Sequence, residues 1–124
     1  MIKKFAGASV WSEDLNNLLP FYRDVLGLKV TGESPGFVLL GNDQSDAPAL
    51  GLGMHSEVHG RNSDPARHMV GLESDDLNAD WQRLKDAGVE FIEDPTEYGG
   101  DMSIATLKDP EGNLVQLWQY RVES

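Results

Sequence analysis

Few side chains in this sequence could carry out chemistry by themselves. Among 124 residues there are three histidines and no cysteine, so a thiolate nucleophile, a disulfide and a cysteine zinc site are all excluded. His55 and His59 have the spacing of two metal ligands on a helix, but Gly60 and the polar residues around them predict a loop. We interpret both histidines as solvated loop residues. No serine lies in a Gly-x-Ser-x-Gly setting either, so no nucleophilic site is predicted.

Acidic side chains are abundant. The chain has 21 Asp and Glu against 10 Lys and Arg, a net charge of -11 at pH 7. This charge repels a phosphate backbone, and no basic stripe offsets it, so we expect no binding to nucleic acid. The neighbouring carboxylates Asp75-Asp76 and Glu93-Asp94 fall at expected helix and strand ends. Capping and solvation explain them there without acid–base chemistry.

Length and composition predict one compact domain. The chain is close to the commonest domain size, and its 40% hydrophobic and 25% charged residues are ordinary for globular proteins. It has no run of 18 apolar residues, and its first residues lack the apolar stretch of a secretory signal. We expect a cytoplasmic protein that does not enter membranes.

One unit of sequence occurs twice. Asp14-Leu15 recurs 62 residues later as Asp76-Leu77, and residues 26–30 (LGLKV) recur in altered form as residues 87–91 (AGVEF). A repeat of this length predicts two copies of one module, about residues 1–60 and 61–124.

Each copy is predicted to contain a strand, a helix and three further strands. Apolar residues at helical spacing precede a glycine in both copies: Leu15, Leu18, Leu19, Tyr22 and Val25 before Gly27, and Leu77, Trp81 and Leu84 before Gly88. Because Pro20 removes one backbone donor, we expect a kink or a late start in the first helix. The strands are expected at residues 5–11, 28–33, 37–41, 49–54, 67–73, 89–93, 102–107 and 114–120. A turn at residues 109–112, DPEG, joins the last two. The fold class is α+β, with two tandem βαβββ modules.

Two segments in register with this repeat resemble those of a known family. They are FYRDVLGL at residues 21–28 and DPEGNLVQL at residues 109–117. With the two βαβββ units, they resemble the glyoxalase, bleomycin-resistance and extradiol dioxygenase family, the vicinal oxygen chelate superfamily. The likeness covers almost the whole chain. It implies that curved sheets form a cup for a small-molecule ligand, and that the protein is a homodimer.

The resemblance also implies where a divalent metal ion would bind. Family enzymes hold it with four side chains, and the matching positions here are Gly7, Gly51, Met69 and Gln116. Glycine has no side chain, and the Met69 thioether is a poor ligand for a hard or borderline ion. Gln116 stands where the family usually has a Glu. We therefore expect no cofactor, with a divalent metal as the alternative if the alignment is displaced.

His68 is one residue from an implied ligand position. Side chains alternate along a strand, so His68 would share the face of Val70 and Leu72, which we expect to pack under a helix. The His68 ring would then point away from the cup, and we do not assign it as a ligand.

The same alternation predicts which side chains line the cup: Gly7, Ser9, Trp11, Gly51, Gly53, Arg67, Met69, Gly71, Leu114, Gln116 and Trp118. The candidate ligand-binding residues among them are Ser9, Trp11, Arg67, Met69, Gln116 and Trp118. The tryptophans and Met69 offer apolar walls, and the others offer polar anchors. Each tryptophan is equally well interpreted as a core or dimer-interface residue.

Three hypotheses for the function follow. In the first, the protein binds a small, largely apolar or aromatic molecule without a catalytic metal. In the second, it is an enzyme, either a metal-dependent lyase or dioxygenase or a metal-free enzyme in which Arg67 and Gln116 polarise the substrate. In the third, its own tryptophans fill the cup and it acts through partner contacts.

Overall fold

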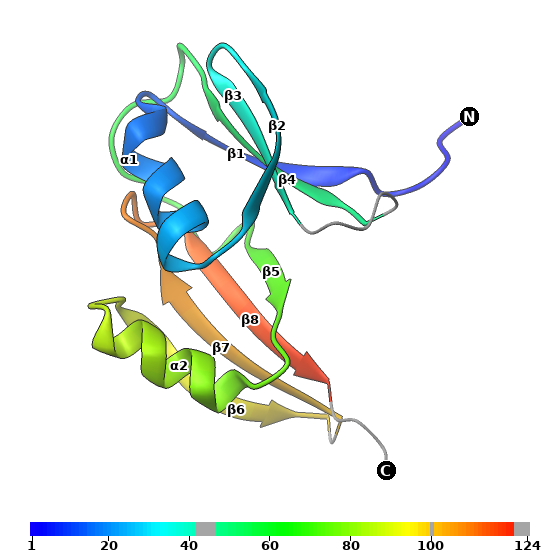
Figure 1. Cartoon of the computed structure of the whole chain (residues 1–124), viewed down its shortest axis with the longest axis vertical. Helices are drawn as coiled ribbons and strands as arrows, with labels where there is room; N and C mark the ends of the chain where they lie inside the picture. The colour runs from blue at the N-terminus through cyan, green and yellow to red at the C-terminus, as the bar shows by residue number, and fades with distance from the viewer. Residues whose placement is uncertain (42–46, 100, 121–124) are drawn as a thin grey trace. The chain divides into compact units, whose positions relative to one another are not determined.

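The computed structural model describes residues 1–41, 47–99 and 101–120. The chain divides into two compact units, Met1–Gly60 and Arg61–Ser124, and each has one four-stranded sheet (Figure 1). Both units have the element order βαβββ, so the predicted α+β class with two tandem βαβββ modules is confirmed. Within the described residues, no helix is long and apolar enough to cross a membrane.

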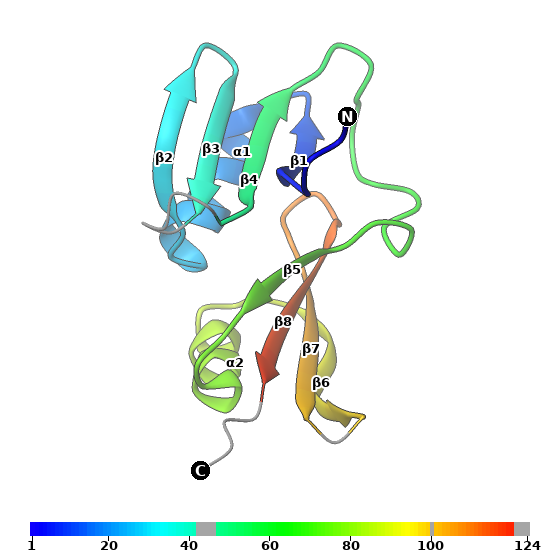
Figure 2. The same ribbon diagram turned by 90° about the vertical axis from the view of Figure 1, so that its right-hand side faces the viewer.

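The first unit contains strands β1 (Gly7–Ser12), β2 (Lys29–Ser34), β3 (Phe37–Gly41) and β4 (Ala49–Met54), with helices α1 (Leu15–Pro20) and η1 (Phe21–Val25) between β1 and β2. The sheet order is β1-β4-β3-β2, and only the β1–β4 pair is parallel. Helix α1 covers one face of this sheet (Figure 2), where Leu18, Leu40 and Leu52 are fully buried. The opposite face carries Ser9, Trp11, Gly51 and Gly53.

Pro20 changes the winding of the first helix. The helix begins at Leu15, where Asp14 caps it by accepting a hydrogen bond from the Asn16 N–H. It does not start late. After Pro20 the chain follows a π-helix, in which the Leu26 N–H donates to the Phe21 carbonyl over 2.9 Å. Because proline has no N–H to donate, the regular ladder is interrupted there, and the wider π-helical turn follows.

The second unit contains strands β5 (Val70–Glu73), β6 (Phe91–Tyr98), β7 (Met102–Lys108) and β8 (Leu114–Tyr120), with helix α2 (Leu77–Asp86) after β5. The sheet order is β5-β8-β7-β6, and only the β5–β8 pair is parallel. Helix α2 is capped by Asp76, which accepts from the Ala79 N–H, and it buries Leu77 and Leu84. One face of this sheet is thus also covered by its own helix.

The turn between β7 and β8 is built around a buried carboxylate. Asp109 accepts hydrogen bonds from the backbone N–H groups of Glu111 and Asn113, and from the Asn113 amide. Gly112 has a positive φ of 82°, which glycine adopts without strain. The predicted hairpin at residues 109–112 is therefore confirmed.

Three strands have the predicted bounds, at residues 37–41, 49–54 and 114–120, whereas others differ. The largest differences are at β5 and β6. Strand β5 begins at Val70 rather than residue 67, because residues 64–67 form a turn in which the Arg67 N–H donates to the Asp64 carbonyl. Strand β6 continues to Tyr98 instead of ending at residue 93.

The two sheets have the same register between their first and last strands. Ser9 lies opposite Gly51 in the first unit, and Gly71 lies opposite Gln116 in the second. The 62-residue repeat maps Ser9 onto Gly71, so it also makes Gly51 and Gln116 equivalent positions. The duplicated backbone thus presents two corresponding faces with different side chains.

Candidate functional site

The uncovered face of the first sheet combines aromatic side chains with glycines. Ser9 and Trp11 of β1 lie opposite Gly51 and Gly53 of β4, as the alternation predicted. The intervening Leu52 is buried under helix α1, so these four residues lie on the other face. Trp11 remains 41% exposed. This face therefore presents a large aromatic surface to solvent.

The two glycines leave space that aromatic rings occupy. A Cβ at Gly53 would lie 2.4 Å from Trp11 Cζ3 and 2.8 Å from Phe37 Cδ2. A Cβ at Gly51 would lie 2.6 Å from Phe37 Cζ and 2.8 Å from the Ser9 hydroxyl oxygen. Any side chain at either position would displace a ring. Glycine thus lets both rings lie directly on the backbone of β4.

Trp11 is the centre of a group of three rings. Its centroid is 5.7 Å from that of Phe37, with a tilt of 35°, and 5.7 Å from that of His55, in an edge-to-face arrangement. Both distances are typical of favourable aromatic pairs. Sequence reasoning did not select Phe37 or His55. The register offered a signal for Phe37, because the predicted strand at residues 37–41 places it opposite Gly53.

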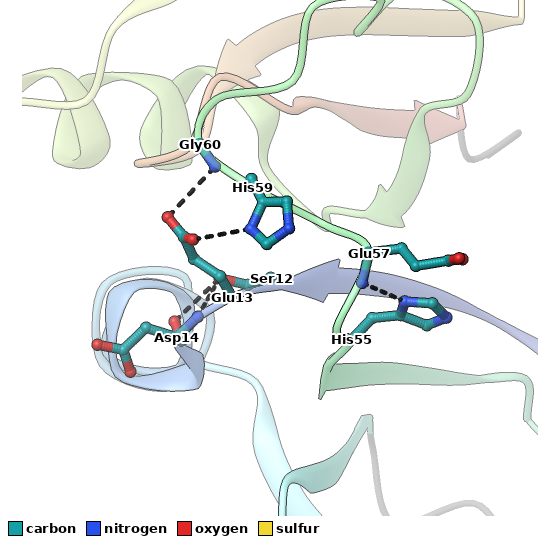
Figure 3. A network of polar contacts seen from close by, with 7 residues as sticks. All are labelled: Ser12, Glu13, Asp14, His55, Glu57, His59 and Gly60. Atoms are coloured by element: carbon teal, nitrogen blue, oxygen red, sulfur yellow. Dashed lines mark hydrogen bonds and ion pairs between the residues drawn. The ribbon is translucent and has the colours of Figure 1, made fainter.

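His55 and His59 lie in an exposed loop, as predicted, and each has a hydrogen-bond partner (Figure 3). His55 Nδ1 accepts a hydrogen bond from the Glu57 N–H, which leaves Nε2 as the protonated nitrogen of the neutral ring. His59 Nδ1 lies 3.3 Å from a Glu13 oxygen, and the Gly60 N–H donates to the other oxygen. The Gly60 N–H, more than His59, lowers the pKa of Glu13 below its ordinary value. These contacts tie the loop to the end of β1.

The uncovered face of the second sheet is more polar. Gly71, Gln116, Thr106 and Glu93 form one row across the four strands. The Thr106 hydroxyl donates to Glu93 over 3.4 Å, and the Tyr98 hydroxyl also donates to Glu93. This bond raises the pKa of Tyr98 above its usual value, because donation to Glu93 stabilises the protonated hydroxyl. Glu93 is thereby held by two hydroxyl groups.

Trp118 lies beside this row. A Cβ at Gly71 would come within 2.8 Å of Trp118 Cζ2, so the indole lies over that glycine. The indole Nε1–H donates to Gln116 Oε1 over 3.2 Å. The predicted proximity of Gly71, Gln116 and Trp118 on one face is therefore present.

Sequence reasoning misses Glu93, because it interprets this residue as a solvated residue at a strand end. That interpretation was wrong, because β6 continues past it to Tyr98. Glu93 instead lies inside the strand, partly buried and bonded to Thr106. The signal available was the alternation of Glu93, Thr106 and Gln116 on three neighbouring strands, but it needed the correct length of β6.

Arg67 and Met69 are placed differently from expectation. Both precede β5, so strand alternation does not put them on one face with Gly71. Arg67 lies in the turn at residues 64–67, where its Nε donates to Asp64 Oδ2 over 2.6 Å. Met69 is 39% exposed. The same turn keeps His68 off the strand, so its predicted orientation toward Val70 and Leu72 does not apply either.

The residues at the four implied metal positions do not fit a divalent ion. A Cβ at Gly7 would lie 2.1 Å from the Ala49 carbonyl oxygen, and the space at Gly51 holds the Phe37 ring. Met69 and Gln116 supply only a thioether and an amide. Elsewhere in residues 1–41, 47–99 and 101–120, no three His, Cys, Asp or Glu side chains gather as a metal site would require.

Known proteins resemble this chain in sequence and in fold. The uncharacterized protein YurT of Bacillus subtilis (strain 168) is 27% identical over 126 residues, which covers 94% of this chain and 98% of YurT. The structure of virulence protein STM3117 from Salmonella typhimurium has a TM-score of 0.74 at 20% identity, covering 98% of this chain and 99% of that one. A glyoxalase/bleomycin resistance protein/dioxygenase family enzyme from Burkholderia phytofirmans PsJN has a TM-score of 0.72 at 19% identity, covering 96% and 100%. At these identities the two structures show a shared fold.

Family membership rests on the sequence match. Residues 4–117 match the sequence model of one family, and the two βαβββ units have that family's fold. Because the match includes both units, this chain belongs to the glyoxalase/bleomycin resistance protein/dioxygenase superfamily.

Proposed function

We propose that this protein binds a small, largely apolar or aromatic molecule, without a catalytic metal, and that the uncovered face of the first sheet contacts it. The observation that carries the proposal is the placement of Trp11 and Phe37 on the glycines of β4, with Trp11 still 41% exposed. Two rings lying directly on a strand form a broad apolar surface. Small-molecule sites are mostly apolar and aromatic, with a few polar groups that fix orientation.

A ligand that covers part of this aromatic surface would gain modest affinity. Covering about 100 Å² of apolar surface contributes roughly 2.5 kcal/mol, at about 25 cal/mol per Å². The Ser9 hydroxyl and the Nε2–H of His55 supply polar contacts at the edges of this surface. Because Trp11 fills the space over Gly53 but keeps its outer side exposed, the ring serves as a wall of the site and does not close it.

The remaining candidate ligand contacts belong to the second unit. Gln116 and Trp118 lie on the uncovered face of the second sheet, and we propose both as ligand contacts on that face. Met69 is exposed just before β5, and we propose it as an adaptable apolar contact. Arg67 lies in the turn before β5 with its Nε bonded to Asp64, so strand geometry does not direct it onto the face of Gly71. The metal-free enzyme hypothesis, which needs Arg67 to polarise a substrate, has correspondingly less support.

We also propose a homodimer in the cytoplasm. The family resemblance and the exposed apolar side chains Trp11 and Leu39 on one sheet face support dimerisation. The absence of cysteine is compatible with a reducing compartment.

A titration with N-phenyl-1-naphthylamine tests the binding proposal. This neutral aromatic probe brightens when it leaves water. We expect saturable binding to the unmodified chain and about tenfold weaker binding to Trp11→Ala, equivalent to about 1.4 kcal/mol. Trp81→Ala is the matched control, because Trp81 packs beside Lys85 on helix α2 and donates to Asp94. Thermal unfolding of both variants checks their folding.

Two results would reject the proposal. One is the absence of a saturable signal with the unmodified chain, which would favour the hypothesis of self-filled aromatic surfaces. The other is equal loss of binding in Trp11→Ala and Trp81→Ala.

A further inference from the structure

We infer that the uncovered face of the second sheet holds a separate binding position for a positively charged nitrogen group, such as an amidinium or an ammonium, with Glu93 at its centre. The position differs from the aromatic surface around Trp11, which belongs to the other unit. It shares Gln116 and Trp118 with the contacts proposed above, but it centres on Glu93, which the proposed function does not use.

The Glu93 carboxylate is fixed in orientation. Both hydroxyl donors, from Tyr98 and Thr106, come from the same face of the sheet, and Thr106 is only 4% exposed. Each carboxylate oxygen accepts one of these bonds and keeps a further lone pair. The arrangement orients a negative charge without consuming its capacity to accept hydrogen bonds from a ligand.

Glu93 has no cationic partner among the described residues. Other carboxylates of this unit do: Glu90 lies 3.2 Å from Lys108, and Asp64 lies 2.6 Å from Arg67. The partners of Glu93 are neutral hydroxyl groups. Because these donors are neutral, the negative charge of Glu93 has no counter-charge in the part of the chain that the structure describes, and a bound cation would supply one.

The neighbouring side chains favour the same ligand chemistry. Glu73 lies opposite Trp118 in the parallel register and two residues from Gly71, so it adds a second carboxylate residue to this face of the sheet. Cations are attracted to the face of an indole. Gln116 Oε1 accepts from Trp118 and keeps a second lone pair that can accept from a cationic donor. The net charge of -11 raises the local concentration of cations near any such position.

Benzamidine and benzamide provide a matched pair of probes. They have nearly the same shape, but benzamidine is a cation at neutral pH and benzamide is neutral. We expect benzamidinium to bind at least about tenfold more tightly than benzamide, measured by the NMR shift of the Trp118 indole N–H. The side-chain carboxyl carbon resonance of Glu93 should move with benzamidinium and stay in place with benzamide.

Charge-removing variants separate this position from general attraction to an acidic protein. Glu93→Gln should abolish the preference for benzamidinium. Glu97→Gln is the control: it removes the same charge from the same strand, but Glu97 pairs with Ser103 and points to the opposite face. Trp11→Ala should leave the preference unchanged, so this test and the one for the first unit can fail independently.

The inference is overturned if the unmodified chain binds both probes equally, or if Glu93→Gln keeps the preference. An unmoved Glu93 carboxyl resonance in the unmodified chain would also overturn it, and that measurement needs no variant to fold.

Discussion

The indole of Trp118 lies over Gly71 of the neighbouring parallel strand, so close that a Cβ at Gly71 would be 2.8 Å from the ring atom Cζ2. From this position the indole donates its N–H to Gln116 over 3.2 Å. The orientation of the ring thus depends on the absence of a side chain at Gly71.

Gly71→Ala should therefore move the ring and break its bond to Gln116. The lost hydrogen bond costs about 1 kcal/mol, and alanine recovers about 0.5 kcal/mol in a strand, so the free energy of unfolding should change by less than about 1 kcal/mol. The Trp118 indole N–H resonance should nevertheless shift strongly. Gly32→Ala is the control, since a Cβ there makes ordinary contacts with Leu39, at 3.6 Å from Cδ1 and 3.8 Å from Cβ. An unshifted indole in Gly71→Ala would contradict the packing described.

Metal content provides a second test. The residues at the four implied ligand positions lead us to expect far less than one divalent ion per chain in protein purified without chelator, measured by mass spectrometry. Binding of N-phenyl-1-naphthylamine should be the same before and after treatment with EDTA. A tightly held, near-stoichiometric ion would show that other residues bind metal, and would favour the metalloenzyme hypothesis.

Asp109→Ala should strongly destabilise the second unit. Asp109 is 4% exposed and accepts three hydrogen bonds, at 2.8 Å from Glu111 N, 2.9 Å from Asn113 N and 2.7 Å from Asn113 Nδ2. Removing the acceptor leaves these donors without their partner, and we expect the free energy of unfolding to fall by about 2 to 4 kcal/mol. Denaturant unfolding measures this. Asp101→Ala, at an exposed position before β7, should change stability far less.

The pKa of Glu13 should lie below the ordinary glutamate value, chiefly because the Gly60 N–H donates to its carboxylate. A lowered pKa means that the folded chain binds this proton less readily than the unfolded chain. The associated stability is present above the ordinary value and is lost as the pH falls through the lowered pKa. His59→Gln should raise the pKa only partly, because the larger cause remains. An NMR titration that returns Glu13 fully to its ordinary value in this variant would refute the ranking.

Tyr98 should titrate above its ordinary value because of its bond to Glu93. A raised pKa gives stability that is present below the ordinary value of about 10 and is lost as the pH rises through the raised pKa. In Glu93→Gln the negative charge is removed, and the pKa of Tyr98 should fall toward about 10. An NMR titration of the Tyr98 ring resonances measures the pKa in both proteins, and the absorbance of the tyrosinate ion provides a second measurement. The same pKa in both proteins would remove Glu93 as its cause.

The parts of the fold that sequence alone predicted are those set by local chemistry or by repetition. The repeat of Asp14-Leu15 as Asp76-Leu77 placed both helix starts, and the DPEG segment placed the last hairpin. The alternation of Ser9 and Trp11 also gave the correct face, because β1 is an uninterrupted strand.

Other features depend on tertiary contacts that local patterns do not contain. The sequence predicts a strand that ends at residue 93, but β6 is an edge strand that continues through Pro95, with a shift in register between Glu93 and Thr96 where proline is tolerated. The position of Glu93 inside the strand could therefore not be predicted from the local sequence. The turn that engages Arg67 with Asp64 likewise shortened β5. The position of the Phe37 ring over Gly51 is decided by side-chain packing, which strand periodicity does not specify.

The ring of Phe37 also constrains how this sequence could change over evolution. A single substitution of Gly51 by a carboxylate residue would bring its Cβ to 2.6 Å from that ring. A lineage acquiring a metal ligand at this position would first have to reduce or move Phe37, with loss of aromatic surface at that intermediate stage. The path toward a metal-binding descendant therefore needs at least two coordinated substitutions, and the order in which they occur matters.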